Sequence, residues 1–137
     1  MKETRNLEFK QDITNSFLKT VSAFANYGSG EIKFGICDDG TVAGIKNPNQ
    51  MCLDIENKIN DSIDPVPDFT LAVSKDNVIT LSVEEGVYKP YFYKSKAYRR
   101  NDSSTIEVDR LELSRLILEG QNKNFEDLAS KEQNLSF

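Results

Sequence analysis

The sequence predicts an α+β fold in which helices pack on a mixed or antiparallel sheet. An apolar stripe at helical spacing runs through Ile13–Asn26. Apolar residues then alternate with polar residues or glycine over Glu31–Cys37, the pattern of a strand with one buried face. Asp39-Gly40 follows this strand and favours a hairpin turn, because the preferred two-residue turns need positive φ.

The first elements follow from local signals. Asn6–Lys10 is a short strand candidate that precedes the helix Ile13–Asn26. Asp12 or Thr14 is the expected N-cap of this helix. Gly28 is expected to end it in the left-handed conformation.

The middle of the chain predicts a second helix and a second hairpin. A further strand is expected to resume at Val42, after the Asp-Gly turn. Residues 47–49 (Asn-Pro-Asn) open a helix, and the two prolines within residues 64–68 must end it. Residues 69–73 and 79–83 alternate in polarity on either side of a polar turn, which predicts two paired strands.

The C-terminal part predicts one more helix and a linker. Asp109 is the expected N-cap, and Glu112 completes a capping-box pattern three residues later. Gly120 is expected to end this helix. We therefore expect a domain over residues 1–120 and a polar linker over residues 121–137 that leads toward a C-terminal region missing from this sequence.

Composition narrows the class of protein. The chain has 137 residues and a net charge of −5, which fits one soluble domain. It contains no histidine, so a Ser-His-Asp triad, a Cys-His pair and a histidine-ligated zinc site are excluded. Cys37 and Cys52 lack metal-type spacing and are expected to be free thiols. No apolar run reaches membrane-spanning length and the N-terminus has no signal-peptide core, so we expect a cytoplasmic protein without membrane contact.

Four charged residues are candidates for catalysis. Glu8 and Lys10 lie two residues apart, so on a strand they share a face. Glu3 and Asp38 supply further carboxylates if turns bring them to Glu8. Glu3, Glu8 and Asp38 are thus the candidate Mg²⁺ or Mn²⁺ ligands, with Lys10 to neutralise charge on a phosphate. Solvated surface charge at a strand edge is the alternative.

A second candidate site is the segment Tyr88–Arg100. It holds five Lys or Arg residues, no acidic residue and four of the five tyrosines. Basic residues between aromatic ones suit single-stranded nucleic acid, because cations follow the backbone while rings stack on bases. The candidate binding residues are Lys89, Tyr91, Lys94, Lys96, Tyr98, Arg99 and Arg100. The alternative is that the tyrosines are amphipathic strand residues, half in the core.

Several segments together resemble the Schlafen/AlbA-like domain, formerly called the divergent AAA domain. The segments are residues 3–10, 21–26, 33–45, 89–91 and 97–105. The resemblance covers residues 1–120 and implies an AlbA-like α+β fold. It also implies the N-terminal module of a larger transcriptional regulator.

The resemblance implies two different activities. Microbial members of this family are described as DNA-binding domains, so DNA or RNA is the expected partner and no cofactor is required for binding. Some animal members are RNA endonucleases whose acidic triad matches Glu3, Glu8 and Asp38, which implies Mg²⁺ or Mn²⁺. Those nucleases pair two such modules, so a homodimer would have to supply the second one.

We therefore expect a DNA-binding domain of a microbial transcriptional regulator. A metal-dependent RNA endonuclease is the first alternative, and a dimerisation module without catalytic activity is the second.

Overall fold

A four-stranded mixed sheet forms the centre of the molecule. The computed structural model describes residues 2–135, with side chains as far as residue 122. The strands, in spatial order, are β1 (Leu7–Lys10), β2 (Gly30–Phe34), β5 (Ile79–Val83) and β4 (Phe69–Val73). β1 and β2 are parallel, whereas β2 with β5 and β5 with β4 are antiparallel. The predicted α+β class is confirmed.

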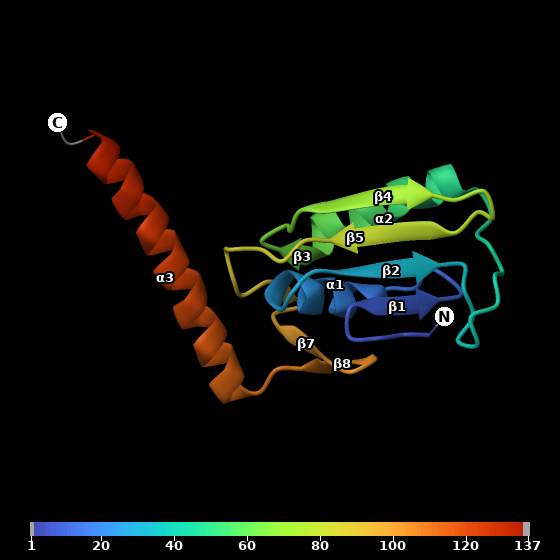
Figure 1. Cartoon of the computed structure of the whole chain (residues 1–137), viewed down its shortest axis with the longest axis horizontal. Helices are drawn as coiled ribbons and strands as arrows, with labels where there is room; N and C mark the ends of the chain where they lie inside the picture. The colour runs from blue at the N-terminus through green and yellow to red at the C-terminus, as the bar shows by residue number, and fades with distance from the viewer. Residues whose placement is uncertain (1, 136–137) are drawn as a thin grey trace.

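Two helices, α1 (Phe17–Asn26) and α2 (Pro48–Ser62), lie behind the sheet in Figure 1. The Phe17 ring of α1 meets the Phe34 ring of β2 edge to face, with 5.3 Å between centroids. Phe24 is also fully buried. Each buried phenylalanine side chain stabilises the fold by about 1.5–3 kcal/mol. The predicted packing of this helix against this strand is confirmed.

Two short ladders complete the strands. β3 (Ile63–Asp64) pairs with β6 (Phe92–Tyr93), and β7 (Tyr98–Asn101) forms a hairpin with β8 (Ser104–Glu107). β7 also contacts α1. The hairpin therefore places β7 against the helix α1.

The helix α1 begins later than the sequence predicts. Its first residue is Phe17, and the preceding residues form a tight turn in which Phe17 N–H donates to the Thr14 carbonyl oxygen at 3.3 Å. The predicted caps Asp12 and Thr14 are wrong, since Ser16 holds the cap position. The Thr14 hydroxyl is hydrogen-bonded to the Ser16 hydroxyl at 3.0 Å. Gly28 follows the helix with φ of 89°, as expected.

The predicted strand after Asp39-Gly40 does not form. A single bridge joins Ile36 to Val42, and Val42 is 49% exposed. β2 pairs along its whole length with β5 instead, because Ile79, Leu81 and Val83 present a continuous buried row. The predicted hairpin of residues 69–73 and 79–83 is confirmed as β4 and β5.

The last helix, α3, spans Arg110–Leu135. Asp109 Oδ1 accepts a hydrogen bond from the Glu112 amide at 2.8 Å, which confirms the predicted cap. The predicted end at Gly120 is wrong, because α3 continues through it. A Cβ at Gly120 would clash with the Lys89 carbonyl oxygen, so glycine permits close approach here. The linker role of residues 121–137 stays a prediction, and residues 136 and 137 lie outside the described part.

The structure bears on two expectations drawn from composition. Cys37 and Cys52 are free thiols. Among the described residues, no helix has both the length and the apolar character needed to span a membrane.

Candidate functional site

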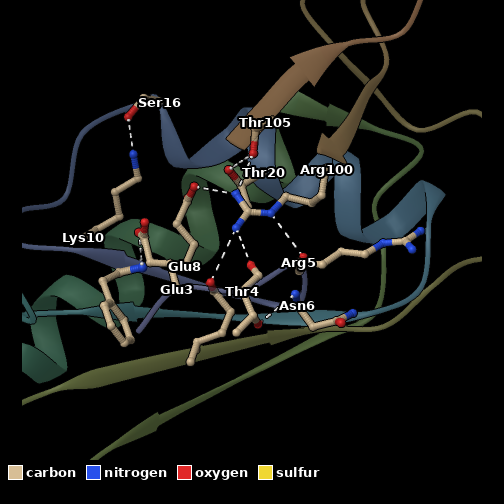
Figure 2. Close-up of polar contacts among 12 residues, drawn as sticks. Glu3, Thr4, Arg5, Asn6, Glu8, Lys10, Ser16, Thr20, Arg100 and Thr105 are labelled. Carbon is tan, nitrogen blue, oxygen red and sulfur yellow. Dashed lines mark hydrogen bonds and ion pairs between the residues drawn. The ribbon is translucent and has the colours of Figure 1, made fainter. Parts of the chain in front are cut away.

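A buried ion pair joins two residues that the sequence assigns to different sites. Glu8 lies opposite Ile32 in the β1–β2 register, so it faces the helix layer. Arg100 reaches it from β7, and its Nη1 atom lies 2.9 Å from Glu8 Oε1 (Figure 2). Both side chains are buried, the guanidinium almost completely. The pair therefore belongs to the interior of the fold.

The remaining donors of Arg100 bind the N-terminal turn. Nη2 donates to the Thr4 carbonyl oxygen at 2.8 Å, and Nε donates to the Arg5 carbonyl oxygen at 3.2 Å (Figure 2). Nη1 also donates to Thr105 Oγ1 at 3.0 Å. Arg100 thus fastens residues 4–7 to the β7–β8 hairpin, and its donors are occupied within the protein.

The three predicted carboxylates do not form one group of metal ligands, although Glu3, Glu8 and Lys10 all lie on or beside β1. Glu3 Oε1 accepts the Phe9 amide at 2.8 Å, which places this carboxylate beside β1. Lys10 shares a face with Glu8, and its Nζ donates to Ser16 Oγ at 3.1 Å. Asp38 is exposed in the turn after β2.

The described carboxylates do not form a ready-made divalent-metal site. Over the described residues, no group of three or more Asp, Glu or Cys side chains could hold a metal ion. Glu8 Oε2 is nevertheless buried with no hydrogen-bond partner among them. Metal binding by Glu3, Glu8 and Asp38 stays a prediction that would need Asp38 to approach β1.

The seven predicted binding residues of Tyr88–Arg100 do not share one exposed face. Four of the seven predicted binding residues are buried, one is half-buried and two are exposed. The buried residues are Lys89, Tyr91, Tyr98 and Arg100, the half-buried one is Arg99, and the exposed ones are Lys94 and Lys96. The alternation of β7 explains the last part of this pattern, because Tyr98 and Arg100 point inward while Arg99 points outward.

Lys89 is held between two carboxylates. Its Nζ lies 2.6 Å from Glu85 Oε2 and 2.8 Å from Glu119 Oε1, and its side chain is almost fully buried. Burial acts to lower the pKa of Lys89, but the hydrogen bonds and charges of Glu119 and Glu85 outweigh it and raise the pKa above its usual value. Since Glu119 lies on α3, Lys89 fastens this helix to the domain.

Two polar residues of α1 that sequence reasoning did not single out hold Tyr91 in place. Asn26 Oδ1 accepts the Tyr91 amide at 2.7 Å, and Asn26 Nδ2 donates to the Tyr91 carbonyl oxygen at 3.1 Å. The Ser22 hydroxyl donates to the same carbonyl oxygen at 2.7 Å. Ser22 and Asn26 lie four residues apart within an apolar helix, and that spacing is the signal that indicates a shared buried face.

A polar pocket of about 410 Å³ lies between the N-terminal turn, β7 and the first turns of α3. We call it the arginine pocket. Its lining residues are Arg5, Tyr27, Arg99, Arg100, Asp109, Leu111, Glu112 and Arg115. Among the described residues, neither Arg5 nor Arg99 makes an ion pair, while Arg115 Nη1 lies 3.5 Å from Glu112 Oε1. Of the predicted binding residues, Arg99 and the buried Arg100 line this pocket.

The sequence did not reveal the arginine pocket because its residues come from separate elements. Figure 2 shows the Arg5 side chain extending away from the contacts of Arg100, although Arg100 binds its carbonyl oxygen. Tyr27 follows α1 and Arg115 lies on α3. The Tyr27 hydroxyl is buried and makes no hydrogen bond of good geometry in the described part of the chain, although the Glu112 carboxylate lies close to it. Burial, followed by the charge and hydrogen-bonding contact of the neighbouring Glu112 carboxylate, raises the pKa of Tyr27.

The mixed sheet, the helices behind it and the β7–β8 hairpin define an α+β domain with an AlbA-like fold. The Schlafen, AlbA_2 family model matches residues 3–109, so the chain belongs to this family. No curated protein matches the chain significantly.

Solved structures share the fold. A crystal structure of the DIP2311 protein from Corynebacterium diphtheriae is 18% identical, with a TM-score of 0.61 over 82% of this chain. The chain spans only 23% of that protein's length. The solution structure of the N-terminal domain of a RecG-related protein from Nitrosomonas europaea is 23% identical, with a TM-score of 0.51. That match covers 80% of this chain and 85% of the domain.

Proposed function

We propose that this chain is a DNA-binding domain of a microbial transcriptional regulator, and that the arginine pocket contacts the DNA backbone. The observation that carries the proposal is the placement of Arg5, Arg99 and Arg115 around one pocket. Guanidinium groups bind phosphate oxygens through paired, charge-assisted hydrogen bonds. The name of the Nitrosomonas europaea relative connects that protein to an ATP-dependent DNA helicase, which also favours nucleic acid as the partner.

The net charge of the chain is negative, but basic residues gather near β7, where we propose that DNA binds. The exposed side chains of Lys94 and Lys96 lie on the segment that leads into β7, so they add positive charge to the same part of the chain. Lys96 Nζ lies 3.5 Å from Glu107 Oε1, so this exposed salt bridge partly offsets the charge of Lys96. Lys94 lies over the Tyr93 ring at 5.4 Å from the centroid. Phosphate neutralisation supplies most non-specific affinity, so a local cluster of cations favours binding even in an acidic chain.

The test is a salt titration of DNA binding, followed by fluorescence anisotropy. Single-stranded DNA, duplex DNA and RNA of one sequence are compared for the wild type, Arg99→Ala and Lys75→Ala. Lys75 is an exposed control in the turn between β4 and β5, at the opposite end of the sheet from the start of α3 (Figure 1). Arg99→Ala is expected to weaken DNA binding and reduce the salt slope by about one unit.

Three results would contradict the proposal. One is the absence of salt-dependent binding to any DNA. Another is an unchanged affinity and slope for Arg99→Ala. The third is a preference for RNA over both forms of DNA, which would identify RNA as the partner.

A metal-dependent ribonuclease is the second candidate, and the unsatisfied Glu8 Oε2 atom favours it. Structured RNA is incubated with the protein and Mn²⁺, beside a Glu8→Gln control. Glutamine keeps the shape of the side chain, whereas alanine would leave Arg100 buried without its partner. Equal cleavage by both preparations would exclude ribonuclease activity at Glu8. Light scattering on the same sample tests whether the protein forms a homodimer.

A further inference from the structure

Four arginines and two carboxylates line the arginine pocket, a set that favours an anionic ligand. Arg5 comes from the N-terminal turn, Arg99 from β7 and Arg115 from α3, so three separate elements each contribute an arginine to the pocket lining. Arg100 holds the backbone of Arg5 in place, because it donates hydrogen bonds to the Thr4 and Arg5 carbonyl oxygens. Ligand pockets in proteins have volumes of about 300–1,000 Å³. At about 410 Å³ the arginine pocket suits one nucleotide better than a run of several.

Tyr27 provides a further donor. It lines the arginine pocket, and its buried hydroxyl makes no hydrogen bond of good geometry in the part of the chain that the structure describes. Because Glu112 lies close by but forms no well-aligned hydrogen bond with it, the Tyr27 hydroxyl gains from a better-placed acceptor in the pocket. A phosphate oxygen is an acceptor of the required kind.

The two carboxylates of the arginine pocket distinguish a strand end from a continuous backbone. Asp109 Oδ1 already accepts the Glu112 amide, and Glu112 Oε1 lies 3.5 Å from Arg115. They would repel the second phosphate of a strand that runs through the pocket. They can instead accept hydrogen bonds from a base amino group. A phosphate monoester also carries about −1.5 to −2 charges near neutral pH, more than the single charge of a phosphodiester.

We propose that the arginine pocket holds the terminal phosphate of a nucleic-acid strand, with Arg5, Arg99, Arg115 and Tyr27 as its donors. This inference rests on the proposed function. It adds that the protein distinguishes strands by the chemistry of their ends.

The test compares internally labelled DNA strands of one sequence that carry a 5′-phosphate, a 3′-phosphate or hydroxyl groups at both ends. A terminal phosphate at one end is expected to tighten binding about tenfold. Arg99→Ala should remove the preference, and Tyr27→Phe should reduce it severalfold. Lys75→Ala, at an exposed lysine outside the pocket, should keep it.

Competition experiments identify the group that is recognised. Adenosine 5′-monophosphate is expected to displace the phosphorylated strand, adenosine is expected not to, and inorganic phosphate is expected to compete less well. Equal competition by inorganic phosphate, or none by the monophosphate, would overturn the inference.

Failure of the two proposals can be told apart. If all three strands bind equally and Arg99→Ala weakens them alike, DNA binding stands and the terminal-phosphate site is wrong. If no strand binds, both proposals fail together.

Discussion

The guanidinium of Arg100 lies 2.9 Å from the Glu8 carboxylate, and the two side chains join β7 to β1 inside the fold. The sequence assigns Arg100 to nucleic-acid binding and Glu8 to catalysis. Their mutual contact changes how variants of either residue must be interpreted. A loss of function in Glu8→Ala or Arg100→Ala would first indicate a loss of folding, because each residue neutralises the other.

Removal of one partner of this ion pair should destabilise the protein strongly. Glu8→Ala is expected to lower the free energy of unfolding by about 3–5 kcal/mol, because it leaves a buried guanidinium without its carboxylate. Glu8→Gln should cost less, since its amide oxygen can still accept from Arg100. Urea melts give both values. A loss below about 1 kcal/mol for Glu8→Ala would show that water reaches Arg100.

The hydrogen bonds between Asn26 and Tyr91 make a second prediction. Asn26→Ala removes the acceptor of the Tyr91 amide, which lies in a buried environment. The expected cost is about 1–3 kcal/mol in urea melts. Asn60→Ala, at an exposed asparagine of α2, is the matched control and should change stability by less than about 0.5 kcal/mol. Equal effects of the two substitutions would contradict the role given to Asn26.

Local periodicity predicted the elements well where one face of an element is buried. The β4–β5 hairpin follows from strict alternation around a polar turn, and α2 follows from the proline at its start and from its buried Ile55 and Ile59. Pairing between distant strands has no such local signal. The sequence therefore placed residues after Val42 beside β2, whereas β5 occupies that position.

Buried charge is the other feature that the sequence could not show. Lys89 and Arg100 look like surface cations, but Lys89 binds Glu119 and Arg100 binds Glu8, each across a long distance in sequence. The residues of the arginine pocket are also distant in sequence. Arg5 and Arg115 are separated by about as many residues as the family match contains. The composition gives the number of such residues but not their positions in the fold.

Alkaline pH should destabilise the protein through Lys89. Its pKa in the folded state is raised above the usual 10.5, so the folded protein holds this proton more tightly than the unfolded chain. The resulting stability is fully present below about pH 10.5 and is lost as pH rises through the folded-state pKa. Burial raises the pKa of Tyr91 and Tyr98 and acts in the same direction.

Urea midpoints measured from about pH 9 upward test this dependence. The wild type should lose stability steadily, and Lys89→Met should lose less over the same interval because it lacks the titrating ammonium. Parallel curves for the two proteins would show that Lys89 does not carry the effect.

Gly120 makes a prediction that runs against helix propensity. In an exposed helix, Gly→Ala stabilises by about 0.8–1 kcal/mol. In this protein a Cβ at Gly120 would clash with the Lys89 carbonyl oxygen. Gly120→Ala is therefore expected to lower the free energy of unfolding by about 1–3 kcal/mol in urea melts. Leu118→Ala is the control in the same helix, because Leu118 is 59% exposed and its loss should have little effect.

The same substitution should also weaken DNA binding. Close packing at Gly120 brings Glu119 to Lys89, and both contacts hold α3 against the domain. The first turns of α3 supply Leu111, Glu112 and Arg115 to the arginine pocket. Displacement of α3 in Gly120→Ala would therefore separate Arg115 from Arg99, and affinity should fall by about as much as in Arg115→Ala. Binding at the wild-type level with reduced stability would mean that the pocket does not depend on how α3 is docked.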